Sequence, residues 1–389
     1  MRVTMLVRCL AMMRGGGETR HLAWARELAA LGVDVDIITG IPLVSGEPRH
    51  PVDGVDVELV RSPYARDFVY RWQNRRGFGR LTMTALHLDE EWFCRSAWRR
   101  IAGASRQPDV VHAHALHQAA RLRIGAIPVV INLPGPPNPR YAADLRLADA
   151  LVADGWAAAN LPATLGTPVD RLPKGVDSDQ FHPDGPSARA RLGLEGKRVV
   201  LTVARLVPIK NVQRLLDAMA VVRARLADAH LVVVGDGPEV DTLRQRAAAL
   251  GLADAVTFAG FVPHADTPEF YRAADVFALS SDFDNSPNVV LEAMAAGLPV
   301  VTTDVGGVRE LVADRPGAAA GAVVVPREPA ALAEALEQYL TAPDTARAAG
   351  AHNRARAIAE FSWRTSALRL LDVYHRIVSA RRGVTRASA

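Results

Sequence analysis

The chain has 389 residues, of which 49% are hydrophobic and 23% are charged. That length supports two or three domains with cores of their own and excludes a peptide hormone, a zinc finger or a disulfide knot. The net charge of +4 comes from 46 basic and 42 acidic residues, too small an excess to predict nucleic-acid binding. Two cysteines, Cys9 and Cys94, are too few for a disulfide framework and indicate a reducing compartment, by default the cytoplasm.

A first strand is expected at residues 1–7, where the sequence is mainly apolar. Arg8 ends this run well short of the apolar core of a signal peptide. No later segment approaches the roughly 18 uninterrupted apolar residues that a membrane-spanning helix needs. We therefore expect neither a signal peptide nor a transmembrane helix.

Three glycines at positions 15–17 follow this strand and open a predicted helix that runs to Ala30. They allow the backbone to approach a ligand closely, and the helix N-terminus behind them favours an anion. A dinucleotide-binding G-x-G-x-x-G sequence would require a third glycine where Arg20 stands. The sequence therefore disfavours NAD binding.

Basic and aromatic residues are concentrated between Arg61 and Arg106, where ten arginines face four acidic residues, a local balance of +6. This composition suits a membrane interface, an anionic acceptor such as a lipid pyrophosphate, or nucleic acid. A solvated helical face over core aromatics explains it equally well, so both interpretations stay open. The interleaved aromatic residues are Tyr64, Phe68, Tyr70, Trp72, Phe78, Trp92, Phe93 and Trp98.

A buried strand is predicted at 109–114 and carries two histidines, His112 and His114. Two histidines can form half of a metal site. Only His117 follows with suitable spacing, however, and this region has no cysteine or acidic cluster to complete a ligand set. We therefore expect no metal here, and we expect His112 to pack in the core.

Short β-branched runs followed by helical patterns recur in both halves, for example at 33–38 and 198–203. This alternation predicts βαβ units on parallel sheets. Turn-forming residues cluster at 181–186, so we place the boundary between two doubly wound domains there, giving 1–180 and 181–389. Ligands are expected in a cleft at the carboxyl ends of the strands, and an amphipathic helix from Ser362 is expected to pack in the second domain.

Arg205 and Lys210 stand in a loop that follows the strand predicted at 198–203. Two cations at the carboxyl end of a strand can converge on a diphosphate, the arginine as a planar fork and the lysine as a point charge. The alternative is a pair of solvated surface cations. Lys210 is one of only three lysines in the chain, which favours the functional interpretation.

The segment 280–301 has the pattern of a loop, a helix and a buried strand. Ser286 is expected as the N-cap, with Pro287 at the first helical position. The start of this helix offers free backbone N–H groups to an anion. Asp284 and Glu292 flank that start, and carboxylates beside a phosphate site suit the hydroxyls of a sugar nucleotide. In the alternative interpretation Glu292 is simply exposed.

The order of these C-terminal motifs resembles that of the retaining glycosyltransferases of family 4. The resemblance extends over nearly the whole chain, and it implies the GT-B architecture: an α/β fold of two Rossmann-like domains that face a central cleft. It further implies that residues 1–180 bind the acceptor and residues 181–389 the donor. The matching segments are Arg205 with Lys210, 234–239, 256–262, 271–277 and 284–301.

The resemblance assigns the main donor contacts to four residues. Arg205 and Lys210 match the pair that binds the donor diphosphate and offsets charge on the leaving nucleoside diphosphate. Glu292 matches the acid that holds the ribose. Asp284 takes the place of the acid that contacts the transferred sugar, where the family usually has glutamate. The shorter side chain implies a closer sugar, an intervening water or a different donor preference.

The resemblance implies further contacts from both domains. Gly16, in the family's G-G-x-E loop, borders the donor phosphates and the acceptor, and His114 faces the reacting sugar. Val262 meets the nucleobase through backbone groups, which suits a UDP- or a GDP-sugar, and Asn288 and Val289 contribute helix-start amides. The implied catalytic residues are His114, Arg205, Lys210 and Asp284, and the implied donor-binding residues are Gly16, Arg205, Lys210, Val262, Asp284, Asn288, Val289 and Glu292.

The implied reaction moves a hexosyl group from a nucleoside diphosphate sugar to an acceptor hydroxyl with retention of anomeric configuration. No metal or other cofactor and no dedicated protein base are expected. The acceptor would be a glycan, a lipid-linked molecule or a small molecule, anionic ones included, and nucleic acid is not expected. The protein would act in the cytoplasm, or at the inner face of the membrane if residues 61–106 contact lipid. Alternatives are a phosphorylase or epimerase, and a non-catalytic sugar-nucleotide-binding homologue.

Overall fold

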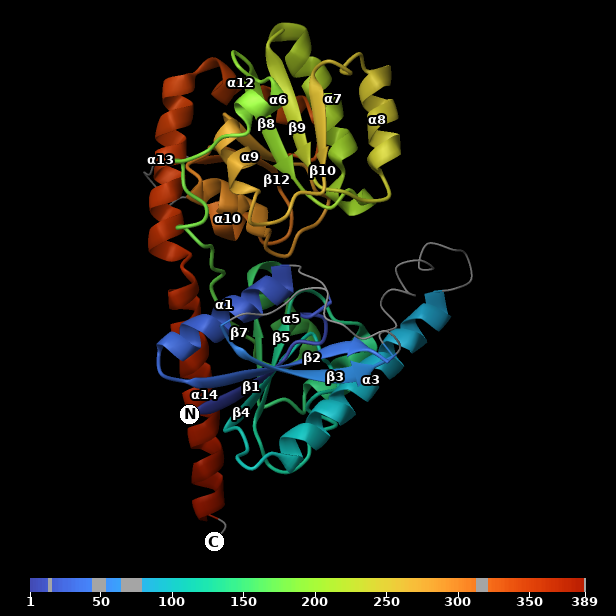
Figure 1. Ribbon diagram of the computed structural model, residues 1–389, viewed down its shortest axis with the longest axis vertical. Helices are drawn as coiled ribbons and strands as arrows, with labels where there is room; N and C mark the ends of the chain where they lie inside the picture. The colour runs from blue at the N-terminus through green and yellow to red at the C-terminus, as the bar shows by residue number, and fades with distance from the viewer. Residues whose placement is uncertain (13–15, 44–53, 64–78, 313–320, 388–389) are drawn as a thin grey trace. The chain divides into compact units, whose positions relative to one another are not determined.

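The computed structural model describes residues 1–12, 16–43, 54–63, 79–312 and 321–387, which form two compact units (Figure 1). Met1–Pro173 and Trp363–Ala389 make up the first unit, and Lys174–Ser362 make up the second. Each unit is built on one parallel sheet with helices on its faces, which confirms the predicted α/β class. Among the described helices, none is long and apolar enough to cross a bilayer.

The first unit has a seven-stranded sheet in the order β3-β2-β1-β4-β5-β6-β7. Its strand order reverses at the central pair β1 and β4, and the carboxyl ends of parallel strands at such a point commonly bind ligands. The strands are β1 (Arg2–Leu6), β2 (Asp34–Pro42), β3 (Asp56–Ser62), β4 (Val110–His114), β5 (Val129–Leu133), β6 (Ala150–Ala153) and β7 (Asp170–Arg171). The helices are α1 (Gly16–Ala30), α3 (Gly79–Gly103), η1 (Pro139–Tyr141), α4 (Ala142–Leu145), α5 (Gly155–Leu165) and α14 (Trp363–Ala387).

The second unit has a six-stranded sheet in the order β10-β9-β8-β11-β12-β13, which reverses between β8 and β11. The strands are β8 (Arg198–Val203), β9 (Ala229–Val234), β10 (Val256–Gly260), β11 (Val276–Leu279), β12 (Val300–Thr303) and β13 (Ala322–Val325). The helices are α6 (Arg189–Leu192), η2 (Pro208–Lys210), α7 (Val212–Arg225), α8 (Val240–Ala249), α9 (Pro268–Ala273), α10 (Asn288–Ala295), α11 (Val308–Val312), α12 (Pro329–Thr341) and α13 (Pro343–Glu360).

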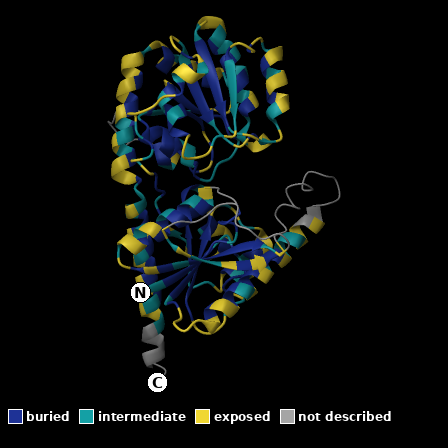
Figure 2. Ribbon diagram, in the orientation of Figure 1, coloured by how far each residue is buried: buried dark blue, intermediate teal, exposed yellow. Residues whose placement is uncertain are grey.

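Both sheets are buried between helices, as the dark strands in Figure 2 show. Strand β9 illustrates why the run from Leu231 to Val234 is continuously apolar. Val232 and Val234 pack in the core on one face of the sheet, while Leu231 and Val233 pack in the core on the other face. Successive side chains point to opposite faces, so a strand covered on both sides needs apolar residues at every position.

The C-terminal helix α14 packs on the first unit, which corrects the predicted domain 181–389. Trp24 Nε1 on α1 donates a hydrogen bond to Ser366 Oγ at 2.8 Å, and the Tyr374 hydroxyl lies 2.5 Å from His112 Nδ1. Leu370 and Tyr374 are fully buried in the core that also holds Trp24. Amphipathic spacing shows that a helix packs but not on what, so the expectation that this helix packs in the second domain was wrong.

Candidate functional site

Two glycines hold the loop that carries Arg205 at the carboxyl end of β8. A Cβ atom at Gly235 would lie 1.9 Å from the carbonyl oxygen of Ala204, and one at Gly237 would lie 2.3 Å from that of Leu206. The Leu206 amide also donates to the Asp236 carbonyl at 2.9 Å. The Gly-Asp-Gly turn after β9 thus packs directly against this loop, and the Arg205 side chain is exposed at its surface.

Lys210 and Asp284 form an ion pair, although 74 residues separate them in the sequence. Lys210 Nζ lies 2.6 Å from Asp284 Oδ1 and 2.8 Å from Oδ2, and both side chains are largely buried. Lys210 ends η2, and its carbonyl accepts a hydrogen bond from Ser280 Oγ at 3.2 Å. The structure therefore brings together two of the predicted site residues, one cationic and one anionic.

The backbone of Asp284 is held by a second pair of glycines. The Gly307 amide donates to the Asp284 carbonyl at 3.2 Å. Gly306 has φ +50°, and a Cβ atom there would lie only 1.6 Å from the same carbonyl oxygen. Only glycine fits this close approach without moving the loop. The position of the Asp284 carboxylate therefore depends on residues that the sequence analysis did not select.

Arg214 and Asp282 form another support of the site that the sequence analysis missed. Arg214 donates to the Ser280 carbonyl and to the Asp282 carboxylate, each at 2.7 Å, and Asn211 Nδ2 donates to that carboxylate at 3.1 Å. Partial burial raises the pKa of Asp282, but the hydrogen bonds from Arg214 and Asn211 outweigh it and lower that pKa. Only the fold reveals this contact, because Arg214 lies on α7 and Asp282 follows β11.

Helix α10 begins at Asn288, and its N-cap is Pro287 rather than the predicted Ser286. Pro287 has extended backbone angles, φ −74° and ψ 119°, and so precedes the helix instead of occupying its first turn. Ser286 Oγ and Asn288 Oδ1 are buried and find no hydrogen-bond partner in the described part of the chain. Lys174, itself buried, donates its ammonium hydrogen bond to the Ser286 carbonyl. This helix start therefore combines free amides with two unsatisfied polar atoms.

Glu292 lies on α10 and is buried, so the alternative of an exposed glutamate is wrong. Its Oε2 accepts a hydrogen bond from the Tyr271 hydroxyl at 2.7 Å, and its Oε1 lies 3.1 Å from His264 Nε2. Burial, followed by the nearby carboxylate, raises the pKa of Tyr271 well above its ordinary value. Val262 lines a surface pocket together with Phe261, a residue that is 77% exposed.

In the first unit, the start of α1 touches the ring of His114 at the end of β4. A Cβ atom at Gly17 would lie 2.2 Å from His114 Nε2, so this glycine allows the backbone to approach the imidazole. His114 Nδ1 lies 3.2 Å from Asn132 Oδ1, and the exposed Gly16 begins the helix. The predicted residues Gly16 and His114 therefore lie at the same edge of the first sheet.

His112, on the same strand, has different surroundings from His114. His112 is fully buried, and burial, followed by repulsion from His114, lowers its pKa to about 3. It therefore packs as a neutral side chain, as expected. In the described ranges, no group of three or more histidine, cysteine or acidic side chains is arranged to hold a metal ion.

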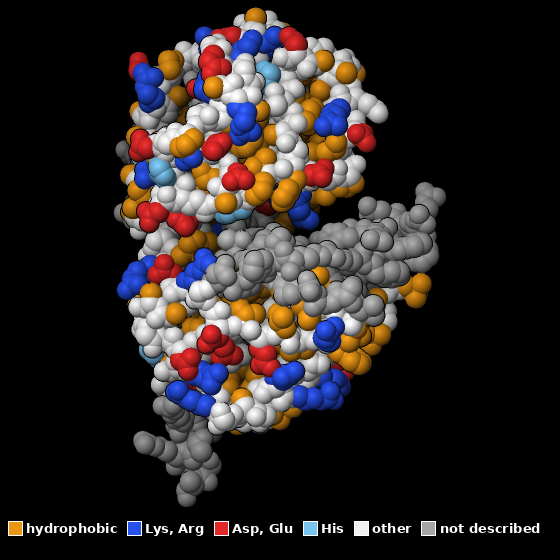
Figure 3. All heavy atoms as spheres, in the orientation of Figure 1, with side chains coloured by type: hydrophobic (Ala, Val, Ile, Leu, Met, Phe, Trp, Pro, Cys, Tyr) orange, Lys and Arg blue, Asp and Glu red, His pale blue; other side chains and the backbone are white. Residues whose placement is uncertain are grey.

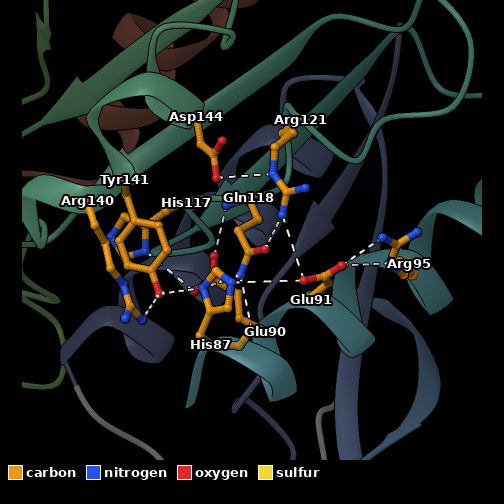
Figure 4. A network of polar contacts seen from close by, with 10 residues as sticks. All are labelled: His87, Glu90, Glu91, Arg95, His117, Gln118, Arg121, Arg140, Tyr141 and Asp144. Atoms are coloured by element: carbon orange, nitrogen blue, oxygen red, sulfur yellow. Dashed lines mark hydrogen bonds and ion pairs between the residues drawn. The ribbon is translucent and has the colours of Figure 1, made fainter. Parts of the chain in front are cut away.

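His117 belongs to a polar network between α3 and the loops after β4 and β5 (Figure 4). Its Nδ1 lies 3.5 Å from Glu90 Oε2, and its ring stacks on Tyr141 at 4.5 Å. The Tyr141 hydroxyl accepts a hydrogen bond from Arg140 at 2.7 Å and lies 3.1 Å from His87 Nδ1. This network lies at the carboxyl edge of the first sheet, where parallel sheets commonly bind ligands.

The basic and aromatic segment 61–106 is only partly covered by the structure. Its residues Tyr64, Phe68, Tyr70, Trp72 and Phe78 lie outside the described residues. Of the others, Phe93 and Trp98 are fully buried on the core side of α3, as the interpretation of a solvated helix over core aromatics predicted, and Trp92 is 50% exposed. Figure 3 shows hydrophobic and basic side chains side by side on this part of the surface.

Comparisons with known proteins identify the family. Residues 15–159 match the model described as Glycosyl transferase 4-like domain, and residues 185–356 match Glycosyl transferases group 1. D-inositol 3-phosphate glycosyltransferase from Frankia alni is 30% identical, over 94% of this chain and 95% of that protein. The chain belongs to the group 1 glycosyltransferases of the family 4 type. The predicted family is thus confirmed.

Another relative of this group 1 glycosyltransferase matches over a shorter length. GDP-mannose-dependent alpha-(1-6)-phosphatidylinositol monomannoside mannosyltransferase from Mycolicibacterium smegmatis is 37% identical over 53% of this chain, and the match spans only 56% of that relative.

Among solved structures, HepE from Anabaena in complex with UDP superposes with a TM-score of 0.74 at 20% identity, covering 97% of this chain and all of that one. Sucrose-phosphate synthase from Thermosynechococcus elongatus superposes with a TM-score of 0.75 at 22% identity, covering 97% of this chain and 99% of that one. The GT-B fold is therefore confirmed.

Proposed function

We propose that this group 1 glycosyltransferase moves a hexosyl group from a nucleoside diphosphate sugar to an acceptor hydroxyl, with retention at the anomeric carbon. The observation that carries the proposal is the start of α10. There the buried Ser286 Oγ and Asn288 Oδ1 find no partner among the described residues, and the loop before the helix carries Asp284, which pairs with Lys210. Free amides and a cation suit a diphosphate, and carboxylates suit sugar hydroxyls.

The donor is proposed to replace the ion pair between Lys210 and Asp284. Lys210 then turns to the diphosphate beside Arg205, and the freed Asp284 carboxylate accepts a hydroxyl of the transferred sugar. Amides of Asn288 and Val289 contact the phosphates. Glu292 binds the ribose and the Val262 backbone meets the base, while Gly16 and His114 of the first unit keep the roles that the resemblance implies.

Catalysis is proposed to depend on charge stabilisation of the leaving group. The bond between the anomeric carbon and the phosphate oxygen breaks, and negative charge develops on the diphosphate, where Arg205, Lys210 and the α10 amides stabilise it. The acceptor oxygen attacks from the same face, and the departing phosphate oxygen takes its proton. In this scheme the two cations balance the charge of the diphosphate, so no metal ion and no protein base take part.

The names of the relatives support the proposed substrate classes. One is GDP-mannose-dependent, and HepE was solved with UDP and with UDP-glucose, so a GDP- or UDP-sugar is proposed as the donor. The relative from Frankia alni is a D-inositol 3-phosphate glycosyltransferase by name, which supports an anionic small molecule among glycan, lipid-linked and small-molecule acceptors. We also propose that the protein acts in glycoconjugate biosynthesis in the cytoplasm and has no nucleic-acid partner.

The test combines binding and product analysis. Nucleotide sugars of UDP, GDP, ADP and dTDP are added to the protein in EDTA-treated buffer, and the true donor is expected to raise the melting temperature most, because it binds only the folded state. With that donor and D-inositol 3-phosphate or a lipid-linked acceptor, the anomeric configuration of the product is read by NMR. Inverted product, or activity that requires an added metal, contradicts the proposed mechanism.

Asp284 gives one specific reason to consider a second function. It is shorter than the usual glutamate, and Lys210 already holds its carboxylate. A non-catalytic homologue would bind the donor but release no nucleoside diphosphate with any acceptor, and calorimetry beside a turnover assay separates the two cases. A phosphorylase or an epimerase is recognised by its product, a sugar phosphate or a rearranged nucleotide sugar.

Helix α3 supports a peripheral membrane contact, which we include in the proposal. Leu81, Leu88 and Trp92 are 62%, 59% and 50% exposed, and their spacing of seven and four residues places them on one helix face. Arg95 and Arg99 continue the same face and are exposed. Apolar and indole side chains followed by arginines suit an anionic lipid surface.

Sedimentation with vesicles of phosphatidylcholine and phosphatidylglycerol tests this contact. Leu88→Glu is expected to reduce the vesicle-bound fraction about threefold to tenfold at low salt, since it places a negative charge where lipid would lie. Leu147→Glu is the matched control, because Leu147 is 47% exposed on the same unit but lies between α4 and β6 rather than on α3. If the unmodified protein stays in the supernatant at low salt, or both variants behave alike, α3 is not a membrane surface.

A further inference from the structure

The Glu292 carboxylate is held from two sides by residues of α9 and of the loop before it. Tyr271 donates to Oε2 at 2.7 Å, and His264 Nε2 lies 3.1 Å from Oε1. Only 8% of the Glu292 side chain is exposed, whereas 51% of the His264 side chain is exposed. The histidine is therefore the partner of Glu292 that solvent protons reach, and the tyrosine is enclosed in the core.

His264 is fixed in this position by its own backbone and ring contacts. Its carbonyl accepts hydrogen bonds from Gln180 Nε2 at 3.0 Å and from Thr267 Oγ1 at 2.8 Å. Its ring lies 5.3 Å from that of Phe181. Because two hydrogen bonds hold the His264 carbonyl and the ring lies against Phe181, the imidazole is held toward Glu292 rather than swinging freely in solvent.

The arrangement leaves part of the Glu292 carboxylate available. A carboxylate has about four lone-pair directions on its two oxygens, and Tyr271 and His264 use one on each oxygen. The remaining directions suit two neighbouring hydroxyls, as on a ribose. Both oxygens must point correctly for such a pair, so the strength of the two supporting hydrogen bonds decides how well the carboxylate is oriented.

We propose that His264 is a positioning residue that makes nucleotide-sugar binding dependent on pH, through its hydrogen bond to Glu292. This inference rests on the proposed function, because it takes the ribose to bind at Glu292. With His264 protonated, the bond to Oε1 is charge-assisted and the carboxylate is held firmly. Protonation also places a positive charge beside the Glu292 carboxylate. With His264 neutral, that bond weakens and the charge is lost.

The charged groups around His264 act in the same direction. The hydrogen bond to Glu292 raises the pKa of His264 above its ordinary value of 6.5, against the effect of burial, and the Glu292 and Asp177 charges add to the rise. Asp266 is a further acid of the same loop. The Tyr271 pKa lies well above its ordinary value, so the tyrosine keeps its proton and donates throughout. Affinity should therefore be high on the acid side and fall as the pH rises through the raised pKa of His264.

Calorimetric titration with UDP-glucose and with GDP-mannose from about pH 6 to about pH 8.5 tests the inference. The diphosphate of these donors has no proton that titrates in this range, so its charge is constant. The unmodified protein is expected to lose about threefold to tenfold in affinity across it. His264→Gln keeps a donor at the position of Nε2 but cannot be protonated, so its affinity should hardly change with pH. His264→Ala should bind weakly at every pH.

Two further variants separate positioning from a general loss of structure. His375→Gln changes an exposed histidine of α14 and should reproduce the pH dependence of the unmodified protein. Tyr271→Phe removes the other support of Glu292 and should weaken binding without removing the pH dependence. A flat profile for the unmodified protein, or an undiminished pH dependence in His264→Gln, overturns the inference while leaving the proposed function intact. If neither donor binds at any pH, the donor assignment falls, and the inference falls with it.

Discussion

Arg205→Ala is expected to lower turnover by about 100-fold to 1000-fold without unfolding the protein. In the proposed reaction, Arg205 stabilises charge that appears on the diphosphate only as the glycosidic bond breaks, so the loss should fall mainly on kcat. The side chain is exposed at the end of β8, and its loop is held by backbone contacts to Gly235 and Gly237 rather than by the guanidinium. Removing the side chain should therefore leave the melting temperature nearly unchanged.

Steady-state kinetics and thermal unfolding, measured together, check this expectation. The matched control is Arg347→Ala, which removes an arginine that is 73% exposed on α13 and pairs with Asp344. That variant should keep normal turnover, because a surface ion pair contributes little. Turnover of Arg205→Ala close to that of the control would refute the role assigned to Arg205.

Gly306→Ala is expected to destabilise the second unit by about 3 to 4 kcal/mol and to abolish activity. Its φ of +50° strains any residue with a Cβ, and the new atom would lie 1.6 Å from the Asp284 carbonyl oxygen. Backbone cannot yield as a side-chain end does, so the loop of Asp284 must move. This displacement breaks the geometry of the Lys210–Asp284 pair, and donor binding should be lost with it.

Gly251→Ala separates the two causes, because Gly251 has φ +70° and an added Cβ would meet nothing within 4 Å. It should cost about 1 kcal/mol from backbone strain alone and leave activity unchanged. Chemical denaturation gives the free energies of unfolding of both variants, and calorimetry gives their donor affinity. Equal destabilisation of the two would show that strain, rather than the contact with Asp284, explains the loss at Gly306.

Local patterns were sufficient to predict most of the framework from the sequence. The alternating strands and helices gave both parallel sheets, because an apolar β-branched run bounded by turns has few other uses. The position of Arg205 at a strand end followed from the same pattern. The environment of Glu292 among apolar neighbours correctly indicated burial, since a carboxylate on an apolar helix face must find partners inside.

The contacts between distant segments were not predictable in this way. Lys210 meets Asp284, and Arg214 meets Asp282, only after β8 and β11 have become neighbours in the sheet. Lysine side chains are usually exposed, yet Lys174 is buried and donates to the Ser286 carbonyl. The cap of α10 is shifted by one residue, because local propensity does not determine whether a proline ends the preceding loop or begins the helix.

The return of α14 to the first unit has a consequence for how the chain folds during synthesis. Trp24 finds its hydrogen-bond partner 342 residues later, and His112 finds Tyr374 262 residues later. The second unit is continuous from Lys174 to Ser362, and the Val176 amide donates to the Phe361 carbonyl at 2.8 Å, so its two ends already lie together. That unit can fold on the ribosome while the first waits, with part of its core uncovered, for the last helix to emerge.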